Sequence, residues 1–404
     1  MKSAAWATLL IILFVIALLL QRSLLAVFAL ILSLATAATS LWARYCLTNV
    51  TYKRHFGTRY LNFGEETTLT LAFENAKPLP LAWLLVRESF PEDVALLTGD
   101  LQQNTPGEPS TLVTLLSLRW YERVTRTHRI QGIQRGHFGF GPAELSSGDM
   151  FGYQRRVIED PHIDELLVYP KVVPVEALGL PTARPMGEWF APRRVLADPL
   201  RFASVREYVP GDNPRHIEWR STARTTILQV KEFDPSDTLA LMLAVDVQTT
   251  PRSYEYIPDD LEFVISAAAS IALHALDERH MVGLCANALT RQAETWTRIR
   301  PGRHVNQANA LLSAMAELDP FRGMPLDDML YDIMLELPFG ATVIALTAQP
   351  RPPVYEALAT LQEVGHRVLL LTVGRAAAAV PLQIPHHHLG GANEWQRLEA
   401  LELD

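Results

Sequence analysis

The chain has 404 residues, of which 20% are charged, and a formal net charge of −8. This length exceeds what one hydrophobic core usually holds, so we expect two or three folded units. The negative balance excludes a general nucleic-acid binder, whose affinity depends on neutralising phosphates. The two cysteines, Cys46 and Cys285, lie far apart, which argues against a disulfide framework and fits a reducing compartment.

Two uncharged apolar segments open the chain, at about residues 4–20 and 24–43. Each is close to the minimum length with which a helix crosses about 30 Å of hydrocarbon. Because only a short turn separates them, we predict a transmembrane helical hairpin over residues 1–47. A cleavable signal peptide is the first alternative, and the double apolar run disfavours it. A buried helical hairpin is the second, and the lack of a polar face on either segment disfavours it.

The basic residues around these segments predict their orientation. Lys2 precedes the first segment and Arg44 follows the second, whereas Arg22 alone lies between them. Basic flanks stay on the cytoplasmic side of a membrane. We therefore expect a multi-pass protein of the cytoplasmic membrane, with the lipid bilayer as one partner and with its soluble domains in the cytoplasm.

Residues 48–175 carry the pattern of a strand-rich domain. The segment 66–75 alternates apolar and polar residues, and further short segments of this kind follow, separated by proline and glycine turns. This pattern predicts an antiparallel β-sandwich. The glycines at residues 135–142 are typical of a tight turn, and no Gly-Lys-Ser/Thr sequence occurs, so a P-loop is excluded.

Residues 176–236 combine a Pro-rich linker with the Arg-rich sequence REYVPGDNPRHIEWRSTAR at residues 206–224. Its Pro-Gly-Asp-Asn-Pro turn predicts a short helix with Pro214 at the first position. Arg215 and Trp219 then lie one turn apart, at a spacing that allows a cation–π contact.

Two interpretations of this segment remain open. In the first it is a structural clamp, in which arginines pair with the acids Glu207, Asp212, Glu218 and Glu232. In the second it is a basic face that docks an acidic partner or a phosphorylated ligand, because planar guanidinium groups suit carboxylate and phosphate. The candidate residues for either role are Arg206, Tyr208, Gly211, Asp212, Arg215, Trp219, Arg220 and Arg224.

Residues 237–380 alternate continuous apolar runs with segments of helical spacing. Alternation of this kind predicts an α/β domain with a doubly wound, mostly parallel sheet. Ligands of such sheets meet the carboxyl ends of the strands, where Asp246, Thr347 and Thr372 are expected. Residues 381–404 are predicted to form a C-terminal tail, and its Pro-His-His-His segment a surface loop.

The sequence around the Arg-rich segment resembles a known family. LRFASVREYVPGDNPRHIEWRSTARTTILQVKEFDP is similar to the signature of the bacterial "domain of unknown function 58" proteins, and QRGHFGFGP, DMFG and VYP fall at matching places. The resemblance implies an integral membrane protein with a von Willebrand factor A-like α/β domain. It also implies a partner, since some members are thought to work beside MoxR-type AAA+ ATPases and transglutaminase-like proteins in the cell envelope.

The resemblance implies a metal site that this sequence keeps only in part. A von Willebrand-type site uses Asp-x-Ser-x-Ser after the first strand, and here Asp246 and Thr250 match whereas Gln248 replaces a serine. Ala348 stands where a later aspartate is expected. Because a hard divalent ion wants an oxygen-rich set of ligands, we expect a degenerate site and no cofactor, with Mg²⁺ as the alternative.

These observations predict a membrane-anchored interaction or scaffold protein, with a MoxR-type ATPase as its candidate partner. A Mg²⁺-dependent ligand-binding or adhesion module is the alternative. No Gly-x-Ser-x-Gly sequence occurs and neither cysteine has a local histidine, so no catalytic constellation is predicted. An enzyme would instead require a pocket that gathers Asp246, His304 or Arg220.

Overall fold

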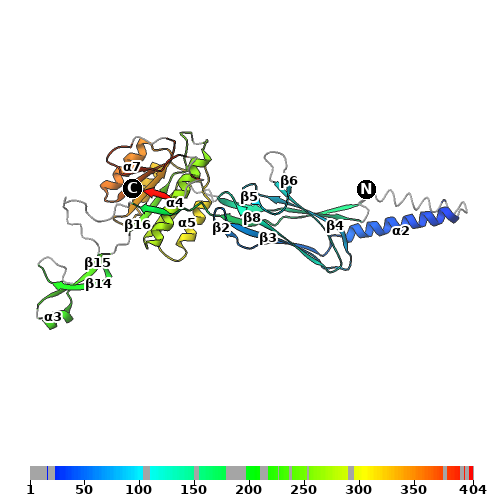
Figure 1. Cartoon of the computed structure of the whole chain (residues 1–404), viewed down its shortest axis with the longest axis horizontal. Helices are drawn as coiled ribbons and strands as arrows, with labels where there is room; N and C mark the ends of the chain where they lie inside the picture. Colours follow the sequence, from blue (N-terminus) through cyan, green and yellow to red (C-terminus); the bar gives the residue numbers. More distant parts are fainter. Residues whose placement is uncertain are drawn as a thin grey trace. The chain divides into compact units, whose positions relative to one another are not determined.

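The computed structural model of the chain divides into two compact units, Met1–Lys171 and Val172–Asp404 (Figure 1). The residues that the structure describes are 16, 23–102, 110–149, 154–178, 197–209, 217–225, 227–235, 239–252, 254–289, 295–375, 380–391, 395 and 400–403.

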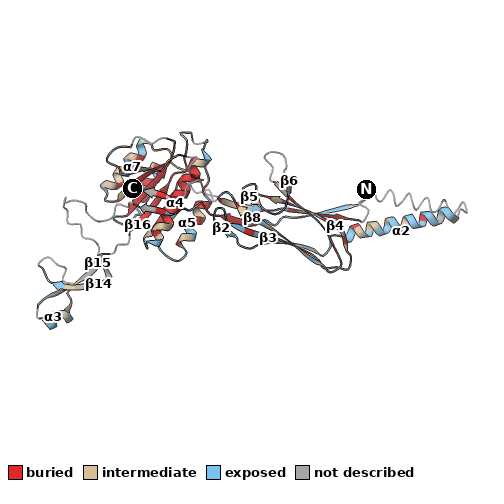
Figure 2. Ribbon diagram, in the orientation of Figure 1, coloured by how far each residue is buried: buried red, intermediate tan, exposed pale blue. Residues whose placement is uncertain are grey.

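The first unit begins with the apolar helix α2 (Ser23–Tyr45). Its part Val27–Tyr45 has a mean hydropathy of 1.5 and is 11% buried, so it is long and apolar enough to cross a membrane. In Figure 2 most of this helix has the pale blue of exposed residues. The second of the two predicted apolar segments is therefore a helix.

The described residues do not show the predicted transmembrane hairpin. Apart from Ile16, the first apolar segment, residues 4–20, lies outside the described residues. Within the described part, the structure has one N-terminal apolar helix rather than two. A single helix of this kind near the N-terminus fits a membrane anchor and a signal sequence equally.

Mostly antiparallel sheets make up the rest of this unit in the residues that the structure describes. One sheet has the order β1 (Val50–Phe56), β3 (Glu66–Asn75), β8 (Arg123–Gly132), β5 (Val94–Leu96). A second has the order β11 (Arg155–Asp160), β10 (Ala143–Gly148), β4 (Leu81–Phe90), β7 (Ser110–Leu118), β6 (Leu101–Gln102). A third joins β2 (Tyr60–Leu61), β12 (Asp164–Val168) and β9 (Gly136–Phe140), with β2 and β12 parallel. The predicted antiparallel β-structure is confirmed.

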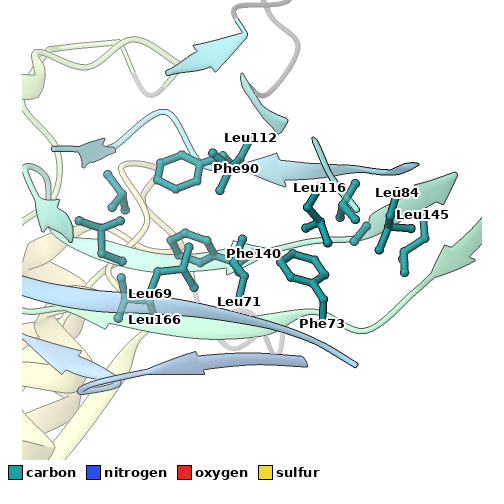
Figure 3. Close-up of a cluster of buried hydrophobic side chains, with 14 of the residues drawn as sticks. Leu69, Leu71, Phe73, Leu84, Phe90, Leu112, Leu116, Phe140, Leu145 and Leu166 are labelled. Atoms are coloured by element: carbon teal, nitrogen blue, oxygen red, sulfur yellow. The ribbon is translucent and has the colours of Figure 1, made fainter. Parts of the chain in front are cut away.

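The two larger sheets share one hydrophobic core, as expected of a sandwich (Figure 3). Leu71 and Phe73 of β3 face inward and are buried, since alternate residues of a strand point to the same side of a sheet. Phe90 of β4 and Phe140 of β9 meet edge to face, with ring centroids 5.1 Å apart. The alternation read from residues 66–75 thus places the inner face of β3 correctly.

A buried ion cluster joins the three sheets of this unit. Arg54 of β1 lies 3.1 Å from Glu88 of β4 and 3.2 Å from Asp164 of β12, and all three side chains are nearly inaccessible to solvent. Arg54 also donates to the carbonyl oxygens of Phe140 and His162. One guanidinium therefore satisfies two buried carboxylates and two backbone carbonyls, as a buried charge requires.

We predict that Arg54→Met lowers the free energy of local unfolding of this sandwich by about 3–5 kcal/mol, because the Glu88 and Asp164 carboxylates remain buried without a cation. Native-state hydrogen exchange of the β1 and β4 amides in the full chain measures the change. The matched control is Arg59→Met, since the Arg59 side chain is 69% exposed and 3.7 Å from Asp164. This variant should change stability by less than about 1 kcal/mol. Equal effects of the two variants would contradict a stabilising role for the cluster.

The second unit contains a six-stranded mixed sheet in the order β18 (Thr297–Gly302), β17 (Met281–Ala286), β16 (Ala240–Val245), β19 (Thr342–Thr347), β20 (Arg367–Thr372), β21 (His386–His388). Only β18 runs antiparallel to its neighbour. The helices that contact this sheet are α4 (Pro258–Asp277), α5 (Gln307–Ala316), α6 (Leu326–Met334) and α7 (Pro352–Glu363). The mixed α/β architecture that we predicted for the C-terminal part is confirmed.

Helices cover both faces of this sheet. Met242 and Ala244 of β16 belong to a buried cluster with α6 and α7. The alternate residues Leu241 and Leu243 are equally buried, and α4 contacts β16, β17 and β19. Figure 2 shows the resulting concentration of buried residues in the sheet. Strands buried on both faces explain the continuous apolar runs of the sequence.

Residues 381–404 differ from the predicted C-terminal tail. His386–His388 form β21, the edge strand beside β20, and the Thr372 hydroxyl lies 3.1 Å from a ring nitrogen of His388. Farther on, β22 (Leu401–Leu403) pairs with β13 (Val175–Leu178). The histidine segment is not a loop, because pairing with β20 satisfies its backbone groups. Local sequence patterns do not predict these strand pairings, because the paired strands are separated along the chain.

Candidate functional site

The Arg-rich segment lies in a small β-hairpin of the second unit. Strands β14 (Ala197–Glu207) and β15 (Gln229–Pro235) pair antiparallel, and the short helix α3 (Trp219–Thr225) lies between them in the sequence. The Gln229 amide donates to the Thr222 hydroxyl over 3.0 Å, and the Glu218 amide donates to the Gln229 carbonyl over 2.8 Å. Polar bonds to the start of β15, rather than a buried side chain, therefore hold α3 in place.

Helix α3 buries none of its residues. Trp219 is 68% exposed, and Arg220 and Arg224 are exposed as well. A helix of a folded domain normally turns an apolar stripe to a core, and one this short is marginal without packing. We call Trp219, Arg220 and Arg224 the α3 surface. Its large side chains are presented to the surroundings of the hairpin.

Of the remaining candidate residues of this segment, the structure describes Arg206 and Tyr208. Arg206 is exposed at the end of β14, where a guanidinium nitrogen donates to the Glu207 carbonyl over 3.1 Å. Tyr208 is half-buried, and its amide donates to the Leu228 carbonyl. Gly211, Asp212 and Arg215 lie outside the described residues, and so does the expected contact between Arg215 and Trp219.

The structure gives Glu218, one of the acids of the predicted clamp, a partner in β15. The ammonium nitrogen of Lys231 lies 2.8 Å from the Glu218 carboxylate. The hydrogen bond from Lys231 lowers the pKa of the Glu218 carboxyl group below its ordinary value. Lys231 and Glu218 meet because the register of the hairpin brings Lys231 next to the start of α3. The side chain of Glu232 lies outside the described residues.

The second predicted site lies at the carboxyl end of β16, where Asp246 is completely buried. One carboxylate oxygen accepts from the Asn287 side-chain amide over 2.8 Å and from the Gln248 backbone amide over 3.0 Å. The other accepts from the Thr347 hydroxyl over 2.7 Å. The Thr347 hydroxyl in turn accepts from the Gln349 amide over 2.9 Å. Both carboxylate oxygens are thus hydrogen-bonded within the fold.

The loop that follows Asp246 is closed by further bonds. The Gln248 side chain donates to the Thr250 carbonyl over 2.7 Å and accepts from Arg322 over 2.7 Å. The Thr250 hydroxyl lies 2.8 Å from the carbonyl oxygens of Arg252 and Glu255, and it donates to one of them. Thr250 therefore turns to its own loop, and no contact joins it to Asp246.

These contacts do not suit a Mg²⁺ site. Burial raises the pKa of the Asp246 carboxyl group, while hydrogen bonds from Thr347, Asn287 and Gln248 oppose the rise. A hard cation needs several oxygen ligands that point to one position, whereas here N–H and O–H donors face the Asp246 oxygens. Among the residues that the structure describes, no group of three or more histidine, cysteine, aspartate or glutamate side chains is placed to hold a metal.

Sequence reasoning named Asp246 and Thr347 at strand ends but missed Asn287. This residue directly follows β17, the strand next to β16, so the rule that strand carboxyl ends meet at one edge of the sheet was enough to find it. Arg322 had no such signal, since it comes from the segment between α5 and α6.

We predict that Asp246→Ala lowers the free energy of unfolding of the α/β unit by at least about 2 kcal/mol, because the Asn287 and Thr347 donors remain buried without an acceptor. Hydrogen exchange of the β16 and β19 amides measures the loss. Thr250→Val, which removes only loop bonds, should cost less. Mg²⁺ or a chelator should leave the unchanged protein equally stable. A Mg²⁺-dependent gain in stability that Asp246→Ala abolishes would restore the metal interpretation.

The fold and the two sites define a class of protein with two units. An antiparallel β-unit follows an apolar helix, and a mixed α/β unit carries an exposed arginine and tryptophan surface and a fully hydrogen-bonded strand-end aspartate. Residues 204–332 match the family model "Protein of unknown function DUF58". The chain is also 25% identical over 245 residues to "Uncharacterized protein YeaD" of Bacillus subtilis (strain 168). Residues 204–332 thus match the DUF58 family, and the chain is similar to YeaD.

This similarity covers part of each protein, namely 58% of this chain and 55% of YeaD. Among solved structures, proximal thread matrix protein 1 from the mussel byssus is 10% identical with a TM-score of 0.30 over 40% of this chain and 46% of that protein. A non-cellulosomal cohesin from Archaeoglobus fulgidus is 12% identical with a TM-score of 0.21, over 30% of this chain and 91% of the cohesin. Scores of this size assign neither fold nor function.

Proposed function

We propose that this DUF58 protein is a membrane-tethered interaction protein, which presents its α/β unit and the α3 surface to a protein partner. The observation that carries the proposal is helix α3, which exposes Trp219, Arg220 and Arg224 and buries no side chain. Tryptophan and arginine are enriched among the residues that dominate protein–protein binding.

The chemistry of the α3 surface defines the partner. Two exposed guanidinium groups, Arg220 and Arg224, are positively charged at every physiological pH and suit paired hydrogen bonds to carboxylates. Exposed Trp219 beside them supplies a flat apolar contact. The partner is therefore an acidic surface with an apolar pocket. The family resemblance favours a MoxR-type AAA+ ATPase in an envelope-related process as the protein that carries this surface.

The tether in this proposal is helix α2, joined by the apolar segment of residues 4–20 as a second membrane span. The basic flanks of these segments favour a cytoplasmic position for both folded units. The α/β unit is a von Willebrand factor A-like domain that has lost its metal function. Hydrogen bonds occupy the strand-end Asp246, so this domain acts by presenting surfaces and not by binding a cation.

We predict that Arg220→Glu together with Arg224→Glu abolishes partner capture. The two new carboxylates would face the acidic residues of the partner, and like charges repel. The measurement is a crosslinking pull-down of the full chain from native membranes, with captured proteins identified by mass spectrometry. The matched control reverses two exposed arginines of the β-unit, Arg87→Glu with Arg126→Glu, and should keep the captured set.

Hydrogen exchange of β14 and β15 in the α3 variant shows whether the hairpin stays folded. Retained folding with loss of captured proteins supports docking. Unchanged capture by a folded α3 variant would contradict the proposal and would leave the segment a structural clamp.

A further inference from the structure

Helix α2 and the β-unit are joined rigidly. Cys46 and Leu47, which directly follow α2, are buried in the sandwich core, and Trp42 of the last turn packs against it. The guanidinium group of Arg156 in β11 donates to the Arg44 carbonyl over 2.6 Å. The end of α2 is therefore fixed to one end of the sandwich. Any bilayer crossed by α2 faces this end.

The turn between β7 and β8 lies at this same end. Strand β1 begins at Val50, opposite Asn75 at the end of β3. The Ala76 amide donates to the Asn49 carbonyl over 3.0 Å, and the Asn75 amide donates to the Glu122 carbonyl over 2.9 Å. Only a few residues of chain separate Asn49 from the end of α2 at Tyr45. These bonds fix the turn close to the end of α2.

This turn, Arg119–Arg123, has an unusual composition for an exposed position. Trp120 is 67% exposed and Tyr121 is 70% exposed, and Arg119 and Arg123 on either side are exposed too. The segment thus offers two aromatic rings between two guanidinium groups. We call it the aromatic turn.

The backbone of the aromatic turn is strained. Tyr121 has a φ of 53°, in the left-handed region that bulky side chains rarely adopt. Its amide is held by the Lys77 carbonyl at 3.3 Å. Such strain costs about 1–3 kcal/mol and is concentrated at functional positions. A glycine or asparagine would form this turn without strain, so folding alone does not explain the aromatic residues.

Tryptophan and tyrosine are enriched where membrane proteins meet the headgroup region, because one end of each ring system is polar and the other apolar. Arginines next to a membrane gain about 1 kcal/mol each from anionic lipid. The end of α2 carries the same pair of residue types, with the Arg44 guanidinium 5.9 Å from the centroid of the exposed Tyr45 ring. The aromatic turn extends this interface chemistry from the helix to the sandwich.

We propose that the aromatic turn inserts into the headgroup layer of the bilayer that α2 crosses, with anionic phospholipid as its ligand. This inference rests on the membrane tether of the proposed function. Contact at a second point, beside α2, would stop the helix and the β-unit from tilting together in the bilayer and would set the height of the sandwich above the membrane.

The test places a fluorescent probe at the turn. Cys46 and Cys285 are both buried, so the introduced cysteine of Tyr121→Cys is the target for an environment-sensitive label on the full chain. The chain is reconstituted into vesicles of phosphatidylcholine with phosphatidylglycerol, some of which carry a nitroxide on the lipid headgroup. The control is Gln134→Cys, an exposed position just after β8, at the opposite end of this strand.

We expect a blue shift of the emission and quenching by the lipid-borne nitroxide at position 121, and neither effect at position 134. Replacing Trp120 and Arg119 in the Tyr121→Cys chain (Trp120→Ser with Arg119→Ser) should reduce the quenching, and high salt should reduce it too, because the arginine contribution is screened. Ile133→Ser, a matched removal of an exposed apolar side chain at the far end, should leave it unchanged.

The outcomes separate this inference from the tether. If the unlabelled chain fails to float with vesicles after detergent removal, the tether itself is wrong. If the chain floats but the probe at position 121 shows water-like emission without quenching, the tether holds and the aromatic turn does not insert. A blue shift without quenching by the lipid-borne nitroxide also overturns the inference, since the ring then packs on protein rather than lipid.

Discussion

Every charge that the fold buries must be matched inside it, and this requirement organises both units of the protein. In the β-unit, the Arg54 guanidinium lies between the Glu88 and Asp164 carboxylates and ties three sheets together. In the α/β unit, the buried Asp246 carboxylate is met by side-chain donors from the ends of two neighbouring strands. An unmatched charge at either place would cost several kcal/mol, so these side chains act as structural connections.

The same requirement separates the parts that hold the fold from the parts available to partners. Asn287 and Thr347 each donate a hydrogen bond to one of the two Asp246 oxygens, so these oxygens face donors rather than a cation. The large side chains of α3 do not pack into a core. Hydrogen bonds of the backbone and of a hydroxyl group hold this helix in place. This contrast is the reason why α3, and not the strand-end aspartate, is the docking surface in the proposed function.

The β-unit is joined directly to the apolar helix α2. Cys46 and Leu47 belong to its hydrophobic core, so α2 is not joined to it by a loose linker. Exposed aromatic and basic residues gather at the end of the sandwich where the helix enters. If α2 is a membrane anchor, a connection of this kind would hold the β-unit itself in a defined orientation at the bilayer surface.

The sequence by itself determined the nature of the elements. Alternation over residues 66–75 identified a half-buried strand, continuous apolar runs identified the parallel strands, and the signature around residues 206–224 identified the family. These properties are local, because they depend on the spacing of residues within a single element. The tertiary structure alone decided which side chains meet: Arg54 with Glu88, Asp246 with Asn287, and Glu218 with Lys231. It also turned the expected tail into β21 and β22, since strand pairing joins residues far apart in the chain and leaves no local pattern to predict it.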